Sequence, residues 1–133
     1  LDNFKNLTHG GVMHTGDLYK ILFSAAEDSH VYIFNTDNTG RVQRLFPMKA
    51  LKNVTVNNFN PIQRGKIYYI PSENKSFRLD SQTGTGQIYY LAMKKRDPRL
   101  EQDDFAQGDA QPVLDYLKSI CTDCINVVTF VHQ

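Results

Sequence analysis

The segment from Asn35 to Gly40 reads N-T-D-N-T-G, which places oxygen-bearing side chains at alternate positions ahead of a glycine. Calcium loops of the EF-hand type share this arrangement, and they also need a bidentate acid six positions after the glycine. That position is Phe46, which has no ligand oxygen in its side chain, and Asp37 is the one carboxylate within the segment. We therefore expect a hairpin turn in which Asp37 or Asn38 bonds to the local backbone and Gly40 takes a positive φ.

Cys121 and Cys124 form the second candidate site, in the sequence C-T-D-C. A redox C-x-x-C motif usually stands at the N-terminus of a helix, where the helix dipole lowers the pKa of the attacking thiol. Here the pair follows a predicted helix, and a zinc site would need two further ligands that no second C-x-x-C supplies. We expect a short local disulfide if the protein lies outside the cytoplasm, with free thiols and a redox or metal role as alternatives.

Two tyrosine pairs, Tyr68-Tyr69 and Tyr89-Tyr90, fall in predicted strands. Successive side chains of a strand point to opposite faces, so one ring of each pair is expected in the core. The outward ring is a candidate for partner binding, because tyrosine is favoured at interfaces. Packing without a binding role is the alternative interpretation.

Other patterns that would carry catalysis are missing or stand in the wrong context. The sequence contains no G-x-S-x-G nucleophile motif and no cysteine–histidine spacing typical of proteases. Gly84 and Gly86 open a predicted strand, whereas phosphate-binding loops open a helix. We accordingly predict no catalytic residues, no metal, no cofactor and no enzymatic activity.

The elements that must position these residues are mostly strands. Between Asp17 and Lys95 there are about six short apolar runs separated by turn residues, with no helical pattern between them. The run from Val31 to Phe34 is apolar on both faces, which indicates a central strand. This spacing is typical of an antiparallel β-sandwich or a barrel. We predict a mainly β fold, with the sandwich as its architecture.

The end of the chain has a different pattern. Residues Arg96 to Ala110 are polar and indicate a loop. Pro112 suits a first helical turn and Asp109 an N-cap, and Ile125 to Val131 form a β-branched run. We expect one C-terminal helix and then a final strand. The helix carries apolar residues at helical spacing, namely Val113, Leu114, Leu117 and Ile120.

The bulk composition fits one globular domain. The chain has 133 residues, of which 41% are hydrophobic, so a single β-sandwich domain over residues 1–133 can bury a core. Lys+Arg is 15 and Asp+Glu is 14, a balance that gives no electrostatic reason to expect nucleic acid or an anionic membrane as partner. No apolar run is long enough to span a membrane, and the first residues lack the pattern of a signal peptide.

Several motifs follow one another in a characteristic order. They are T-G-D at Thr15–Asp17, V-Y-I-F-N-T-D-N-T-G-R-V-Q-R-L-F-P at Val31–Pro47, I-Y-Y-I-P at Ile67–Pro71, F-R-L-D at Phe77–Asp80, and the run from Gly84 to Pro98. Over residues 15–98 this order resembles the bacterial domain of unknown function family 4384. One departure is Gln87, where the family often has an acidic residue. The remaining residues 99–133 would supply the loop, the helix and the terminal strand.

The resemblance implies a β-sandwich module of bacterial envelope or secreted proteins, and it brings no catalytic residues. Our first hypothesis is therefore a non-catalytic module for protein–protein interaction or assembly, located in the periplasm, at the outer membrane or in the secreted fraction. Its partner would be a protein, such as a component of an envelope or secretion assembly. One alternative is a small-molecule or glycan-binding domain that uses exposed tyrosines and the asparagine-rich segment Met48–Gln63. The other is a thiol-redox protein that uses Cys121 and Cys124.

Overall fold

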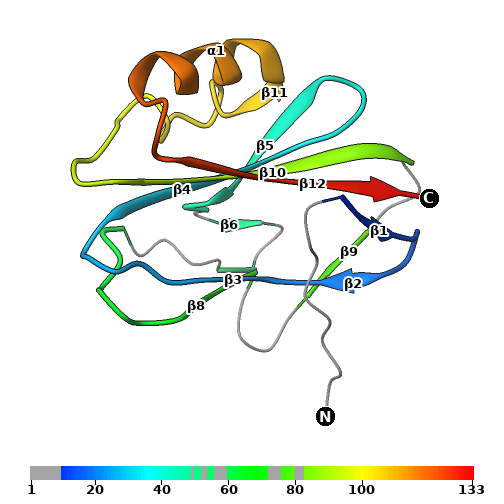
Figure 1. The fold of residues 1–133 in the computed structure, drawn as a ribbon, viewed down its shortest axis with the longest axis horizontal. Helices are drawn as coiled ribbons and strands as arrows, with labels where there is room; N and C mark the ends of the chain where they lie inside the picture. Colours follow the sequence, from blue (N-terminus) through cyan, green and yellow to red (C-terminus); the bar gives the residue numbers. More distant parts are fainter. Residues whose placement is uncertain (1–9, 49, 52–53, 56–59, 72–75, 80–82) are drawn as a thin grey trace.

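A six-stranded sheet forms the centre of the part of the molecule that the structure describes (Figure 1). The computed structural model describes residues 10–48, 50–51, 54–55, 60–71, 76–79 and 83–133. All neighbouring strands of this main sheet are antiparallel except β1 and β12, which are parallel. The predicted mainly β class is confirmed. The strand order is β1 (Gly11–Met13), β12 (Ile125–His132), β10 (Gly84–Met93), β4 (His30–Thr36), β5 (Arg41–Phe46) and β11 (Gln107–Asp109).

Short two-stranded ribbons form a second layer on one face of the main sheet (Figure 1). In one ribbon β2 (Leu18–Tyr19) pairs with β9 (Phe77–Arg78), and in the other β3 (Ile21–Phe23) pairs with β8 (Tyr68–Ile70). A third ribbon joins β6 (Ala50–Leu51) to β7 (Val54–Thr55). The second layer of the sandwich is therefore built from ribbons.

Strand β4 separates two hydrophobic cores because its side chains alternate between the faces. Val31 and Ile33 face the ribbons, whereas Tyr32 and Phe34 face the helix, and all four are fully buried. A strand that is apolar on both faces belongs in the middle of a sheet. Its position between β10 and β5 agrees with that expectation. The ribbon-side core comprises Phe23, Val31, Ile33, Leu45, Phe46, Met48, Ile62, Tyr68 and Ile70.

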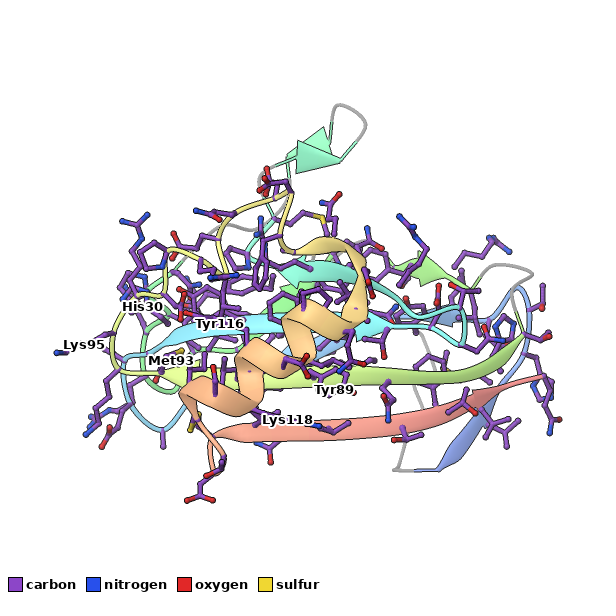
Figure 2. The ribbon with its side chains drawn as sticks, turned by 90° about the horizontal axis from the view of Figure 1, so that it is seen from above. His30, Tyr89, Met93, Lys95, Tyr116 and Lys118 are labelled. Atoms are coloured by element: carbon purple, nitrogen blue, oxygen red, sulfur yellow. A yellow bond between two sulfur atoms is a disulfide. The ribbon has the colours of Figure 1, made fainter. Side chains whose placement is uncertain are left out.

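The predicted helix is present as α1 (Ala110–Ile120), which covers the other face of the main sheet. Figure 2 views the molecule from above and shows α1 crossing the sheet, with Tyr116 and Lys118 on the helix. The side chain of Asp109 caps its first turn by accepting a hydrogen bond from the backbone N–H of Gln111 (3.1 Å). The helix packs apolar side chains on Tyr32, Phe34 and their neighbours through Ala110, Val113 and Leu117.

The final strand β12 lies between β10 and β1, so the two ends of the described chain meet in the main sheet. β10 pairs with β12 from Gly84↔His132 to Leu91↔Ile125. The segment after Pro98 therefore contributes β11 and β12 to the main sheet, and residues 107–109 of the expected loop form a strand. The expected final strand is confirmed.

Candidate functional site

An open cleft of about 480 Å³ lies at the end of the main sheet where the β4–β5 turn, the start of β10 and the end of β12 meet. The ribbon of β2 and β9 faces this end of the sheet and closes one side of the cleft. Aromatic side chains line it on both sides: Tyr19 and Phe77 from the ribbon, and Phe130 from β12. No local sequence motif indicates this cleft, because its walls come from segments that are distant in the chain.

The turn that borders the cleft holds Asp37 in a local network. Its carboxylate accepts hydrogen bonds from the hydroxyl and backbone N–H of Thr39 and from the backbone N–H of Arg41. Burial acts to raise the pKa of Asp37, but these hydrogen bonds and the nearby Arg41 outweigh it and hold the pKa below its usual range. Gly40 has φ +81°, which favours glycine. The turn therefore uses its polar groups mainly for its own geometry.

Two glycines at the start of β10 leave room for side chains from the β4–β5 turn and from the neighbouring strand β12. A Cβ atom at Gly84 would overlap the carboxamide of Asn38, and a Cβ atom at Gly86 would overlap the ring of Phe130. Phe130 stands opposite Gly86 in the register of β10 and β12, and its ring is buried. In the sequence, the G-x-G pattern within a strand is the local signal that side chains approach the backbone of β10 closely at these positions.

A second candidate surface is the outward side of the ribbons, which we call the outer face. Leu18, Leu22 and Ile67 expose 59%, 55% and 56% of their surface, although they are large apolar residues. Tyr69 stands opposite Leu22 in the ribbon of β3 and β8. The outer face is composed of Leu18, Lys20, Leu22, Ile67, Tyr69 and Arg78.

Strand alternation explains why these residues face outward. Between them stand Tyr19, Ile21 and Phe23, which turn toward the main sheet. The ring of Phe23 lies 4.9 Å from that of Phe46, measured between centroids, which anchors the ribbon to the ribbon-side core. The outer face is thus held on a packed layer.

The outer face carries two positively charged side chains. Lys20 lies between β2 and β3, and Arg78 lies on β9. Lys20 lies with its Nζ 5.9 Å from the centroid of the Tyr69 ring, a cation–π contact. Arg78 stands opposite Leu18 in the other ribbon. The outer face therefore combines apolar side chains with positive charge.

The four candidate tyrosines occupy different environments. Tyr68 is buried in the ribbon-side core, and its hydroxyl accepts a hydrogen bond from the backbone N–H of Gln63 (2.9 Å). Tyr90 is half-buried against the same core, whereas Tyr89 is half-buried on the helix side (Figure 2). Tyr69 is the member of the set that lies on the outer face. The structure therefore brings Tyr69, and not the other three, to this candidate surface.

The asparagine-rich segment of the glycan hypothesis is only partly described. Asn53, Asn57 and Asn58 lie outside the described residues. Asn60 pairs reciprocally with the backbone of Val31, at 2.9 and 2.8 Å. Asn60 therefore holds the edge of β4 in place.

A family comparison matches this chain over residues 12–96 to the family described as "Domain of unknown function (DUF4384)". The chain belongs to this family. Comparisons with curated proteins and with solved structures found no match. The family match ends before β11, α1 and β12, so part of the main sheet of this DUF4384 domain lies beyond it.

The predicted disulfide lies in this C-terminal part of the DUF4384 domain. Cys121 and Cys124 are joined in the structure, directly after α1. Cys124 packs against the helix-side core. The pair stands at the C-terminal end of the helix, away from the residues that line the cleft. Among the described residues, no group of three or more His, Cys, Asp or Glu side chains could hold a metal ion.

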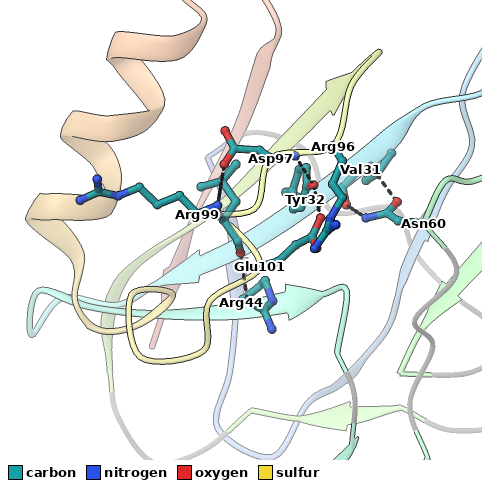
Figure 3. A network of polar contacts seen from close by, with 9 residues as sticks. Val31, Tyr32, Arg44, Asn60, Arg96, Asp97, Arg99 and Glu101 are labelled. Atoms are coloured by element: carbon teal, nitrogen blue, oxygen red, sulfur yellow. Dashed lines mark hydrogen bonds and ion pairs between the residues drawn. The ribbon is translucent and has the colours of Figure 1, made fainter.

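A polar network joins the family-matched region of the DUF4384 domain to the segment that follows it (Figure 3). The hydroxyl of Tyr32 donates a hydrogen bond to Glu101 Oε2 (2.7 Å) and accepts one from the backbone N–H of Asp97 (2.9 Å). Arg96 Nε forms an ion pair with Glu101 Oε1 at 2.8 Å. Burial raises the pKa of Tyr32 above its usual range, and the hydrogen bond to Glu101 and the charge of Glu101 act in the same direction.

The same network satisfies a buried arginine. Arg44 donates from Nε to the carbonyl of Pro47 (2.7 Å) and from Nη1 to the carbonyl of Leu100 (2.9 Å), and it pairs with Asp103. Its side chain is almost fully buried, so these partners offset the cost of removing the charge from water. Each of the three nitrogen atoms of the Arg44 guanidinium group meets a protein acceptor, which indicates a structural role for the network.

Proposed function

We propose that this DUF4384 domain is a non-catalytic protein-binding module of a bacterial envelope or secreted protein. The observation that carries the proposal is the outer face, where Leu18, Leu22 and Ile67 each expose more than half of their surface. Clustered apolar side chains on a folded surface mark interaction sites, since water contact is unfavourable for them.

The composition of the outer face supports a particular kind of protein partner. Full burial of a leucine or isoleucine side chain contributes about 1.5–3 kcal/mol, and each of these three still has more than half of its surface left to bury. Together they supply a useful driving force for binding. Tyr69 and Arg78 are residue types that often carry interface energy. Lys20 and Arg78 favour a partner surface with carboxylates around its apolar residues. The partner we propose is a protein with such an apolar and acidic surface.

The disulfide supports a location outside the cytoplasm. Cys121 and Cys124 are bonded, and disulfides persist in the oxidising periplasm and extracellular space. Among the described residues, no helix has the length and apolar character needed to cross a membrane.

Photo-crosslinking in the native host tests the proposal. A photoreactive amino acid at Leu22 or Ile67 should yield one crosslinked protein partner, and the same group at Val127 should not. Val127 is the matched control because it is also an exposed apolar strand residue, on β12. With the purified partner, Leu22→Asp should weaken binding about tenfold or more, whereas Val127→Asp should leave it unchanged. Unchanged affinity of the Leu22→Asp variant, with an unchanged melting temperature, would refute docking on the outer face.

A further inference from the structure

The cleft at the turn end of the main sheet offers a separate binding surface. We propose that it binds a saccharide that carries a carboxylate group. Its volume of about 480 Å³ falls in the range of about 300–1,000 Å³ that small-molecule sites occupy. Its lining combines aromatic rings, carboxamides and guanidinium groups, and each of these recognises a different part of such a ligand.

The aromatic rings supply an apolar surface. Tyr19 and Phe77 are partly exposed and contact each other with their ring centroids 5.4 Å apart, whereas the buried ring of Phe130 closes the opposite wall. A pyranose ring has a face of C–H groups that packs favourably on aromatic side chains. Phe130 is held in place by its position over Gly86, so this wall is formed before a ligand arrives.

Three carboxamides stand in a row across neighbouring strands. Gln43 of β5 pairs with Asn35 of β4 on one side and with Gln107 of β11 on the other. Residues paired in this way lie on the same face, about 5 Å apart. All three line the cleft, and among the described residues no hydrogen bond engages their side chains. Each carboxamide offers donors and an acceptor, which suits the successive hydroxyl groups of a sugar.

The charged groups of the cleft favour an anion. Arg41 lies two residues before Gln43 on the same strand face, and Arg78 lies across the cleft on β9. Asp37 is the acidic side chain among the described lining residues, and its carboxylate already accepts three hydrogen bonds within the turn. A guanidinium group binds a carboxylate through paired hydrogen bonds. An acidic sugar is therefore favoured over a neutral one of the same shape.

Glucuronic acid and glucose form the matched probe pair, since they differ in a carboxylate and a hydroxymethyl group. The full 133-residue chain, isotopically labelled for NMR, is titrated with glucuronic acid. We expect the amide signals of Asn35, Gln43 and Gln107 to change their chemical shifts. Glucuronic acid should bind more tightly than glucose. Arg41→Gln should weaken glucuronic acid binding about tenfold with little effect on glucose, because only the charge-assisted contact is lost.

Arg64→Gln is the control variant, because Arg64 is an exposed arginine outside the lining of the cleft. Equal affinity for both sugars would overturn the role of the carboxylate. Binding of the dipeptide Ala-Ala in place of glucuronic acid would overturn the saccharide class. The absence of shifts at the cleft with either sugar would overturn the site itself, and it would leave docking on the outer face untouched.

Discussion

Removal of residues 97–133 should unfold the region that the DUF4384 family match covers. The deletion takes α1 from one face of the main sheet and β12 from between β1 and β10. It also removes Asp97, Leu100 and Glu101, which bond to Tyr32 and Arg44. We therefore expect residues 1–96 to lack a stable fold on their own.

The magnitude follows from the side chains that the deletion removes. Leu100, Val113, Leu117 and Phe130 are almost completely buried. Burial of each contributes about 1.5–3 kcal/mol, so the four together supply about 6–12 kcal/mol. A domain of this size is stable by about 5–15 kcal/mol in total. The loss is therefore comparable to the whole free energy of unfolding.

Circular dichroism melts of residues 1–96 and 1–133 measure this difference. The full chain should melt cooperatively, the truncated chain should not, and a separate peptide of residues 97–133 should restore the transition. Within the full chain, Leu117→Ala should lower the free energy of unfolding by about 2–5 kcal/mol. Leu114 on the same helix is partly exposed and provides the control. Leu114→Ala should lower the free energy of unfolding by less than Leu117→Ala does. A cooperative melt of residues 1–96 at an unchanged temperature would refute the reasoning.

Three further predictions concern the sheet and its titratable groups. Gly86→Ala should displace the ring of Phe130 and lower the free energy of unfolding, measured in urea, by about 1–3 kcal/mol. Thr85 is the exposed neighbour, and Thr85→Ala should change the free energy of unfolding by less than about 0.5 kcal/mol. Equal effects of the two substitutions would contradict the close contact between Gly86 and Phe130. Burial raises the pKa of Tyr32, so the folded protein keeps this phenol protonated while unfolded chains ionise near about pH 10. The stability that this phenol contributes is therefore present below about pH 10 and is lost as the pH rises further. Tyr32→Phe should be less stable at neutral pH, but its melting temperature should fall less than that of the unmodified protein at alkaline pH. An identical alkaline loss in both proteins would contradict the raised pKa of Tyr32. For Asp37, burial acts to raise the pKa but hydrogen bonds lower it overall, so its contribution is present above about pH 4 and is lost as the pH falls further. Because this side chain is exposed, we expect the acid-dependent part to be less than about 1 kcal/mol, and it should disappear in melts of Asp37→Asn.

Local patterns in the sequence predicted the class of the fold and several of its elements. The run from Val31 to Phe34 indicated a central strand because it is apolar on both faces. In the structure both faces of this strand are buried. The helix was predictable from its apolar spacing and from the cap at Asp109. These features depend on residues close together in the chain, so a single sequence contains them.

The pairing of distant segments was not predictable in the same way. β1 has three residues and no apolar alternation that would mark it as the parallel neighbour of β12. Alternation also showed that one tyrosine of each pair should be buried, but it did not show which one. That choice depends on the register between β3 and β8, which places Tyr68 opposite Phe23 inside and Tyr69 opposite Leu22 outside.

The candidate sites depend even more on tertiary contacts. The carboxamide row needs three strands in one register, and only two of them, β4 and β5, are joined by a short turn. Gln107 pairs with Gln43 although β10 and the segment that contacts Arg44 lie between them in the sequence. A local motif search therefore finds the turn at Asp37 and misses the cleft beside it.

The ribbon of β2 and β9 contributes to both proposed surfaces, and strand alternation separates Leu18 on the outer face from Tyr19 and Phe77 in the cleft. Tyr19 and Phe77 stand opposite each other and point into the cleft, whereas Leu18 and Arg78 form the neighbouring pair. Leu18 points away from the main sheet, so a change of this side chain alters the outer face and leaves the aromatic wall in place. A change of Phe77 does the reverse. Arg78 also reaches the lining of the cleft, so its variants act on both surfaces and cannot separate protein docking from ligand binding. Leu18 and Phe77 variants together therefore distinguish the two functions within one ribbon.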